Sequence, residues 1–511
     1  MNQKSFGALL RRRAADTHHR YLILVSGEES WRINTARELL DQTDHAWISD
    51  LEIAGVKSIR TDRTAQLLGQ ETNSVVYECG QRIDATALGI ACGTIAGGGM
   101  LILLIPPYDQ WTVPSESRFH ARIFRLLTSC DSVIRVTQGE QEPDIIKYTG
   151  ANPLSSAPTS GIAATPDQGR AIDAIHTVIS GQRKRPAVLI ADRGRGKSAA
   201  LGIAAAQLLN GKLTNILVTG HSRKAVQSVF DHAAANSEQT TLGLHWISPD
   251  QLLRQLPECD LLLIDEAASI HLHKLVQLLK RYPRIAMATT VHGYEGTGRG
   301  FMLRFNLLLD KLTRGWKQIQ LEAPIRWSPH DPLEKLINNI LVLDADLPDI
   351  DPEDFSVGAC RVEKVDPGVL ADNEQILREI FSLLVLAHYK TRPKDLQQLL
   401  DNPDLKIYRL TLNARSRDKT AAVVLLMDEH GLTKQQGKQI FTGKKRPPGH
   451  VLAEILATQL GLPNAATLSM GRIMRIVVHP SLRRHGLGSQ LIKTVCEDTG
   501  LQYDLIGANF S

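Results

Sequence analysis

The stretch Pro186–Leu209, PAVLIADRGRGKSAALGIAAAQLL, restricts the fold of this chain more than any other. A short apolar run is followed by a loop rich in Gly and Arg, and then by an Ala- and Leu-rich segment with helical periodicity. A strand, a phosphate-binding loop and a helix are therefore expected. In such a loop Gly194 and Gly196 let the backbone approach a polyphosphate, Lys197 reaches the β- and γ-phosphates, and the Ser198 hydroxyl holds Mg²⁺.

One position departs from the usual G-x-x-x-x-G-K-[ST] pattern, because Ala191 stands where the first Gly is expected. Alanine fits there if its backbone keeps an ordinary, negative φ. The helix that follows places a partial positive charge at its N-terminus, which favours an anion. The strand before the loop and the helix after it are the context that the motif requires, and they favour a nucleotide-binding loop.

A second part of the same site is indicated by Asp260–Ala268, DLLLIDEAA. Four apolar residues followed by Asp and Glu are typical of a buried strand that carries Asp265 to the Mg²⁺ shell, with Glu266 orienting or deprotonating the attacking water. Without an upstream phosphate loop, the pattern would be an ordinary strand end. With that loop present, we predict that Lys197, Asp265 and Glu266 are catalytic, and that Ser198 and Asp265 bind the metal.

Other residues around this site carry weaker signals. Gln168 precedes the loop, where helicase-type ATPases often place a Gln that reads adenine, and the hydroxyl pair in Ala288–Thr290 suits a γ-phosphate sensor. Arg326 fits either a phosphate contact or a structural ion pair. Gly220–Arg223 fits either a nucleic-acid contact or an ordinary turn. Val291–Gly300, with four glycines, predicts a loop whose mobility follows the nucleotide state.

A second chemical signal is Arg472–Ser489, RIMRIVVHPSLRRHGLGS. A predicted strand, Ile473–Val478, leads into the spacing Arg-x-x-Gly-x-Gly, and an apolar helix is predicted over Gln490–Cys496. This spacing resembles the acetyl-CoA pyrophosphate loop of GNAT-type acetyltransferases, in which Gly allows close approach and a helix N-terminus receives the anion. The strand would offer free backbone groups to the pantetheine arm. His479 and His485 are assigned no catalytic role, because His-Pro at a strand end is usually structural.

The composition restricts the class of protein only mildly. The net charge of +5 over 511 residues permits a polyanionic partner without requiring one. The six cysteines include no C-x-x-C pair, so neither a zinc site nor a disulfide framework is indicated, and a reducing cytosol fits. Ala85–Pro107 is interpreted as a buried helix, a turn at Gly97–Gly99 and a buried strand, not as a membrane span. We predict a cytoplasmic protein with no membrane contact and no stable protein partner.

The order of predicted elements indicates a multidomain α/β protein. Residues 1–150 form an α/β domain, and residues 151–164, rich in Ser, Pro, Ala and Gly, form a linker. Residues 165–345 form a RecA-like P-loop ATPase domain of the RNA-helicase type. After an acidic segment, residues 355–511 form a GNAT-type α+β domain, which is predicted to be incomplete at its C-terminal end.

Taken together, TPDQ, ADRGRGKSA, LLLIDEAA, TTVHGYEGTGRGF, APIRW, AHYKTRPKDL and RIVVHPSLRRHGLGS resemble the tRNA(Met) cytidine acetyltransferase family over nearly all of the chain. The resemblance implies that nucleotide is bound by Gln168, Gly194, Arg195, Gly196, Lys197, Ser198, Ala199 and Arg326. It implies that acetyl-CoA is bound by Ile476, Val477, Val478, Arg483, Arg484, His485, Gly486, Leu487, Gly488 and Ser489.

The activity that the resemblance implies is acetyl transfer from acetyl-CoA to N4 of the wobble cytidine of elongator tRNA(Met), driven by hydrolysis of ATP or GTP with Mg²⁺. One alternative is an RNA-stimulated NTPase with a vestigial acetyl-CoA site. Another is a non-catalytic RNA-binding scaffold, which the intact Lys197, Asp265 and Glu266 disfavour.

Members of that family continue past the position of Ser511 into a further helix and a basic RNA-binding tail. We therefore expect a truncated GNAT domain that binds acetyl-CoA weakly and transfers acetyl poorly, while nucleotide binding survives. The edge left by a missing strand is expected to favour aggregation.

Overall fold

A computed structural model describes residues 3–40, 45–111, 117–140, 163–211, 213–237, 242–290, 299–351, 360–387, 392–413 and 418–509. They form two compact units, each described below by itself. Unit 1 comprises Met1–Val113 and Phe124–Leu343, and unit 2 comprises Pro114–Ile123 and Asp344–Ser511. Nearly all of the predicted linker at 151–164, and most of the predicted glycine-rich loop at 291–300, lie outside the described residues.

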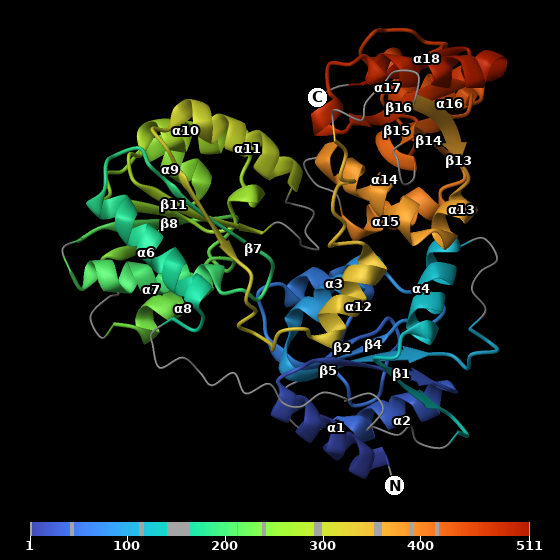
Figure 1. Ribbon diagram of the computed structural model, residues 1–511. Coiled ribbons are helices and arrows are strands. Elements are labelled where there is room, and N and C mark those ends of the chain that lie inside the picture. Colours follow the sequence, from blue (N-terminus) through green and yellow to red (C-terminus); the bar gives the residue numbers. More distant parts are fainter. Residues whose placement is uncertain are drawn as a thin grey trace. The chain divides into compact units, whose positions relative to one another are not determined.

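The first sheet of unit 1 has six parallel strands in the order β3-β2-β4-β5-β1-β6. Helices α1 and α2 cover one face and α3 and α12 cover the other (Figure 1), so the central strands are buried and read as continuous apolar runs. The elements are α1 (Gln3–Thr17), β1 (Tyr21–Ser26), α2 (Glu29–Leu39), β2 (His45–Ile48), β3 (Ser58–Ile59), η1 (Thr61–Leu67), β4 (Thr72–Glu78), α3 (Ala85–Thr94), β5 (Ile95–Ile105), α4 (Arg118–Ser129) and β6 (Val133–Thr137).

The turn predicted at Gly97–Gly99 is wrong. Strand β5 begins at Ile95, directly after α3, and the glycines lie inside the strand. Gly98 has a φ of +84°, and a Cβ on Gly99 would come within 2.0 Å of the Asn73 carbonyl oxygen of the neighbouring strand. The glycines therefore permit an irregular, close strand pairing, which is marked by a register shift near Asn73.

The second sheet of unit 1 has six parallel strands in the order β12-β7-β11-β10-β8-β9. Because the strands are parallel, the carboxyl ends of β7, β11 and β10 meet at one edge. The elements are α6 (Pro166–Ser180), β7 (Ala187–Ala191), α7 (Lys197–Leu209), β8 (Ile216–Thr219), α8 (Gln227–Ala235), β9 (Leu244–Trp246), α9 (Pro249–Gln255), β10 (Leu261–Ile264), η3 (Ala267–Ser269), α10 (Leu272–Arg281), β11 (Ile285–Thr290), α11 (Arg299–Leu312) and β12 (Lys317–Leu321). Helix α12 (Pro332–Leu341) follows in sequence and packs on the first sheet.

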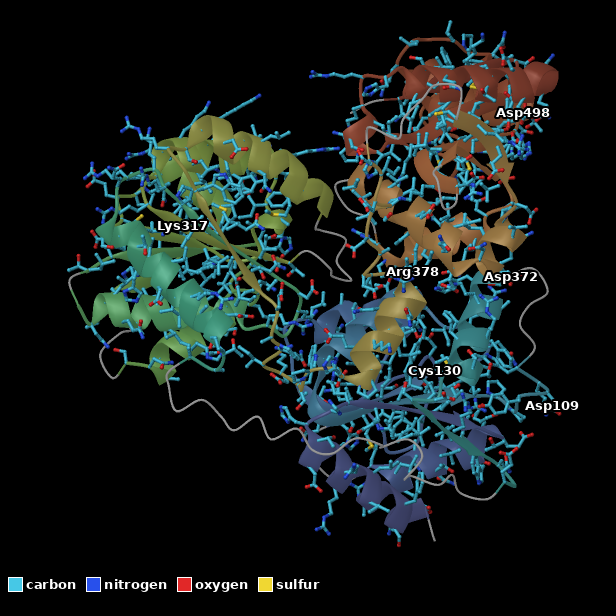
Figure 2. All side chains as sticks on the ribbon, viewed as in Figure 1. Asp109, Cys130, Lys317, Asp372, Arg378 and Asp498 are labelled. Carbon is cyan, nitrogen blue, oxygen red and sulfur yellow. The ribbon has the colours of Figure 1, made fainter. Side chains whose placement is uncertain are left out.

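Unit 2 contains a five-stranded sheet in the order β13-β14-β15-β16-β17, antiparallel except for the last pair. In this unit Arg378 donates to Asp344 at 2.7 Å, and the Tyr408 hydroxyl donates to Asp498 at 2.6 Å. Arg378 and Asp498 are labelled in Figure 2. The elements are β13 (Cys360–Val365), α13 (Pro367–Asp372), α14 (Glu374–Ala387), α15 (Pro393–Asp401), β14 (Leu405–Asn413), β15 (Asp418–Glu429), α16 (Lys434–Phe441), α17 (Val451–Thr458), η6 (Ala465–Thr467), β16 (Met470–Val478), η7 (Pro480–Leu482), α18 (Leu487–Thr499), η8 (Gly500–Gln502) and β17 (Leu505–Ala508).

Residues 430–469, between β15 and β16, form a helical module with a small core of its own, which includes Ile440, Leu452 and Ala457. The buried Glu429 carboxylate accepts hydrogen bonds from the backbone N–H groups of Leu452 and Ala453, at 3.0 and 3.1 Å. It also pairs with Arg472 of β16. The module is therefore fixed to the sheet where β16 begins.

The multidomain α/β fold class is confirmed, with parallel sheets in unit 1 and a mixed sheet in unit 2. All six cysteines have free thiols. Within the described ranges, no helix combines the length and the apolar character needed to cross a membrane.

Candidate functional site

The predicted phosphate loop connects β7 to α7 at the carboxyl edge of the second sheet. Gly194 and Gly196 both have a φ of +78°, a left-handed conformation that glycine adopts without strain, and Gly196 caps α7. Ala191 ends β7 and has no positive φ, which meets the condition for an alanine at this position. Loop backbone N–H groups beside a helix N-terminus provide the geometry that a polyphosphate needs.

Lys197 is the first residue of α7 and is only 8% exposed. Its ammonium donates to the Asp192 carbonyl oxygen at 3.2 Å. Burial lowers the pKa of Lys197, although the nearby Glu266 and Asp265 oppose this shift. A desolvated cation behind the loop fits a phosphate anion, whose charge would stabilise the protonated amine.

Asp265 directly follows β10, and its carboxylate accepts a 2.9 Å hydrogen bond from the Ser198 hydroxyl. It is 5% exposed, and burial, followed by the charge of Glu266, raises its pKa to about 6. The structure thus brings together the two predicted Mg²⁺ ligands from separate elements. A hydroxyl beside a desolvated carboxylate is a donor set that fits this hard cation.

Glu266 lies in the left-handed region with a φ of +53°, which is uncommon for a non-glycine residue and marks a conformation held by its surroundings. Its carboxylate accepts from the backbone N–H of Thr290 at 2.9 Å and from the Thr290 hydroxyl at 2.7 Å. The hydroxyl pair predicted as a sensor is therefore tied to Glu266 through Thr290. The Thr289 hydroxyl is buried and has no hydrogen-bond partner among the described residues.

Gln168 is 2% exposed and contacts the phosphate loop. Its side-chain amide donates to the Gly196 carbonyl oxygen at 3.3 Å and accepts from the Ala164 N–H at 2.7 Å. Thr165 caps α6 by accepting from the Gln168 N–H, as expected of a Thr before Pro. In this structure Gln168 supports the loop backbone.

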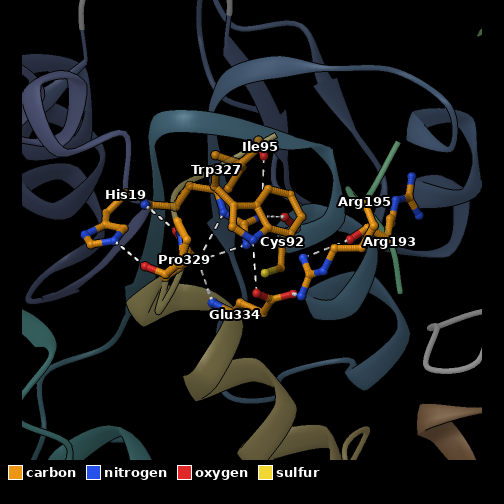
Figure 3. Close-up of polar contacts among 10 residues, drawn as sticks. His19, Cys92, Ile95, Arg193, Arg195, Trp327, Pro329 and Glu334 are labelled. Carbon is orange, nitrogen blue, oxygen red and sulfur yellow. Dashed lines mark hydrogen bonds and ion pairs between the residues drawn. The ribbon is translucent and has the colours of Figure 1, made fainter. Parts of the chain in front are cut away.

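Two arginines predicted to bind nucleotide have protein partners within unit 1. Arg195 donates to Glu334 at 2.9 Å (Figure 3). Arg326 lies 3.6 Å from the Glu71 carboxylate and donates to the Gly93 carbonyl oxygen at 3.5 Å, which is the ion-pair alternative left open for it. Burial lowers the pKa of Arg326, and the neighbouring cations Arg193 and Arg20 add to this effect.

The surroundings of Glu334, the partner of Arg195, were not predicted from the sequence. Trp327 donates from its indole N–H to Glu334 at 3.0 Å, and the Arg20 guanidinium stacks on the Trp327 ring with its Cζ 3.3 Å from the centroid. Trp327 was visible as the last letter of the APIRW motif. Nothing local to Arg20 or Glu334 indicated that either lies near the loop.

In unit 2, strand β16 carries the second predicted site. On one side it pairs with β15 along most of its length, but its pairing with β17 covers only Met470–Ile473. On the β17 side, Ile476, Val477 and Val478 therefore have no strand partner among the described residues. Backbone N–H and C=O groups without a strand partner can hydrogen-bond to the amides of an extended pantetheine arm.

The loop after β16 leads directly into α18. Gly486 has a φ of +79° and caps the helix, which begins at Leu487, three residues before the predicted start. Gly488 and Ser489 consequently lie in the first turn, because the left-handed glycine cap already supplies the change of direction. The side chains of Arg483, Arg484, His485 and Ser489 are exposed, whereas that of Leu487 is buried. An exposed basic loop at a helix N-terminus fits a pyrophosphate.

His479 has the structural role expected of His-Pro at a strand end. It is 7% exposed, its Nδ1 lies 2.7 Å from the Ser481 hydroxyl, and the same nitrogen accepts from the Ser481 N–H at 3.3 Å. Burial lowers the pKa of His479, which favours the neutral ring.

These two loops define the class of protein: a helicase-like P-loop ATPase joined to a GNAT-type acetyltransferase. Three family models match the chain. They are "tRNA(Met) cytidine acetyltransferase TmcA, N-terminal" over residues 1–138, "RNA cytidine acetyltransferase NAT10/TcmA, helicase domain" over residues 188–344, and "GNAT acetyltransferase 2" over residues 379–502.

The chain belongs to the tRNA(Met) cytidine acetyltransferase family. It is 41% identical to tRNA(Met) cytidine acetyltransferase TmcA of Nitrosococcus halophilus, with all of this chain and 72% of the relative covered. It is 33% identical to TmcA of Vibrio cholerae, covering 94% of this chain and 67% of the relative. Among solved structures, the Pif1 helicase of Candida albicans aligns with 52% of this chain and 80% of its own length, at 14% identity and a TM-score of 0.26.

Proposed function

We propose that this chain is an ATP-dependent acetyltransferase that modifies N4 of the wobble cytidine of elongator tRNA(Met). The proposal rests on two sites in one chain of this family. In the phosphate loop, the Ser198 hydroxyl donates to the Asp265 carboxylate, and a GNAT-type loop follows strand β16, which pairs with β17 along only part of its length. A cytoplasmic location follows from the tRNA substrate. The proposal includes an N-terminal domain at residues 1–150, a linker at 151–164, an ATPase domain at 165–345 and an acetyltransferase domain at 355–511.

In the ATPase site, ATP bound with Mg²⁺ supplies the free energy of phosphoryl transfer. The N–H groups of the loop and Lys197 would bind the phosphates, and Ser198 and Asp265 would hold the metal, which neutralises charge on the phosphates when it is bound. Glu266, oriented by Thr290, accepts a proton from the attacking water. Gln168 donates to the loop backbone, Arg195 pairs with Glu334 and Arg326 pairs with Glu71, and all three stay proposed nucleotide contacts.

In the acetyltransferase site, acetyl-CoA supplies an activated thioester. The loop from Arg483 to Ser489 holds its pyrophosphate, and the free edge of β16 at Ile476–Val478 orients the pantetheine arm. The N4 of cytidine is a poor nucleophile because its lone pair is delocalised into the ring, so the enzyme gains most by holding the two reacting groups together. The cytidine must also leave its anticodon stack, which gives the ATPase a physical purpose.

The Glu266→Gln variant should bind ATP with an affinity within about threefold of the parent chain while its kcat falls at least about a hundredfold. Glutamine keeps the shape of the side chain and an acceptor for the Thr290 N–H, but it cannot take a proton. Equilibrium binding of labelled ATP and single-turnover hydrolysis separate the two effects. Glu322→Gln, at an exposed position, is the control. A variant that no longer binds ATP would show that Glu266 has a structural role instead.

The helical module at residues 430–469 supports an RNA partner. It carries five Lys or Arg residues and one Glu, a net charge of +4 in a chain whose total is +5. Lys444, Lys445 and Arg446 lie in an exposed turn after α16. Because the module is fixed where β16 begins, phosphates bound on it would lie at that end of the sheet.

Replacing both Lys444 and Lys445 by Glu should weaken tRNA binding and reduce the slope of log K against log salt by about two, since each lost phosphate contact removes about one released counterion. Filter binding between low and moderate salt gives the slope. The double variant Arg361→Glu and Lys394→Glu, at exposed positions of the same unit, is the charge-matched control. Equal slopes for the test variant and the parent chain would exclude this turn as an RNA contact.

The decisive experiment is mass spectrometry of nucleosides from tRNA incubated with the chain, ATP and acetyl-CoA. N4-acetylcytidine formed only when both ligands are present is the expected result. ATP hydrolysis stimulated by tRNA without any acetylated nucleoside would favour the alternative, an RNA-stimulated NTPase with a vestigial acetyl-CoA site.

A further inference from the structure

Trp327 lies against the phosphate loop. It is 3% exposed, and a Cβ on Gly194 would come within 2.7 Å of its indole ring. The backbone beside it also grips the loop, because the N–H groups of Ile325 and Arg326 donate to the Gly194 carbonyl oxygen at 2.8 and 3.2 Å. Gly194 must therefore be glycine as much for the indole as for a phosphate. The shape of the loop depends on the position of Trp327.

Glu334, in the first turn of α12, joins this indole to the loop a second time. One of its oxygens accepts from the Trp327 indole N–H at 3.0 Å, and the other accepts from Arg195 at 2.9 Å (Figure 3). The Arg195 and Glu334 side chains are 11% and 22% exposed, so the ion pair is largely shielded from water. A shielded, hydrogen-bonded pair resists displacement better than a surface pair does.

Residues in the N-terminal region of unit 1 also contact Trp327 and the backbone beside it. The Arg20 guanidinium stacks on the indole, donates to Asp331 at 2.9 Å and donates to the Cys92 carbonyl oxygen at 2.9 Å. The Arg20 and Asp331 side chains are 1% and 0% exposed. In addition, the Gly97 N–H donates to the Arg326 carbonyl oxygen at 2.8 Å. Arg20 precedes β1 and Gly97 lies in β5, so the first sheet anchors this segment.

We propose that Trp327 is a positioning residue for the nucleotide loop and that Arg20 of the N-terminal region acts through it. The first sheet of unit 1 thereby sets the affinity of the second sheet's site for a nucleoside triphosphate. The inference rests on the proposed function in requiring that the loop bind such a ligand. A continuous set of buried and half-buried contacts carries it: hydrogen bonds and one cation–π stack that run from Cys92 through Arg20, Trp327 and Glu334 to Arg195.

The test uses the full chain and a non-hydrolysable ATP analogue with Mg²⁺. Trp327→Phe keeps an aromatic ring under Arg20 but loses both the bond to Glu334 and the distal indole atoms that face Gly194, and we expect its Kd for the analogue to rise about tenfold. Because the backbone N–H groups of the loop bind the phosphates before the phosphoryl group is transferred, KM should rise in parallel while kcat stays within about twofold. Glu334→Gln, which weakens the pair with Arg195, should act in the same direction without altering the core.

The matched control is Trp316→Phe, because Trp316 also donates its indole N–H to a carboxylate, that of Asp310 at 2.8 Å, and is absent from this set of contacts. Arg20→Lys tests the N-terminal link. Lysine keeps a charge for Asp331 but loses the planar stack, and its effect on Kd should disappear when Phe already stands at 327, since residues acting in series are not additive.

The outcomes separate the two proposals. No analogue binding by the parent chain would contradict the proposed function itself. Parent-like Kd values in folded Trp327→Phe and Glu334→Gln variants, or fully additive effects of Arg20→Lys and Trp327→Phe, would overturn only the positioning inference. A lower melting temperature with an unchanged Kd would show that Trp327 acts on stability alone.

Discussion

Replacing Lys197 by alanine should abolish nucleotide hydrolysis, with kcat/KM reduced at least about a hundredfold, because the variant loses the cation that neutralises charge developing on the transferred phosphoryl group. The fold should survive. Lys197 is buried, which lowers the pKa of its ammonium, and among the described residues that ammonium donates to a backbone carbonyl, that of Asp192. Phosphate release measured with and without tRNA gives the rate, and circular dichroism reports the fold.

Lys280→Ala, at an exposed position in the last turn of α10, is the control for removal of one positive charge. It should hydrolyse ATP at the parent rate. Unchanged turnover in a folded Lys197→Ala protein would contradict the assignment of this loop. If hydrolysis drives the presentation of the cytidine, the same variant should also lose N4-acetylcytidine formation at saturating acetyl-CoA.

The Gly486→Ala variant should bind acetyl-CoA at least about tenfold more weakly, while its ATP hydrolysis is unchanged. A methyl group at this left-handed cap would have no protein atom within 4 Å, so it fits in the protein without a clash. It would instead occupy space that the pyrophosphate of acetyl-CoA needs. Its backbone strain is of the order of 1 kcal/mol. Calorimetry with acetyl-CoA measures the affinity.

The control for that strain is Gly461→Ala. Gly461 has a φ of +69°, close to the +79° of Gly486, and a Cβ there also has nothing within 4 Å. Both variants should lose similar stability, and only Gly486→Ala should lose acetyl-CoA. If both bind acetyl-CoA equally well, the loop after β16 does not hold the pyrophosphate through this glycine.

Local pattern was enough to predict the two loops. An apolar run, a glycine turn and a helical segment are contiguous in both Pro186–Leu209 and Arg472–Ser489, and each part is decided by neighbours in sequence. The same holds for β10, where four apolar residues before Asp265 predict a strand buried on both faces. Local pattern failed at Gly97–Gly99, because glycine marks a turn and an irregular strand equally well, and only the neighbouring β4 selects the strand.

The sequence by itself determined which residues could bind a nucleotide and a pyrophosphate, since these chemistries need a few residue types at short, fixed spacings. The tertiary structure alone decided what the other side chains of those loops contact. Arg195 meets Glu334, Arg326 meets Glu71, and Trp327 is stacked by Arg20, in each case across a long stretch of chain. Such pairs arise when parallel strands and their helices pack, because the packing brings together residues whose sequence separation carries no record of the contact.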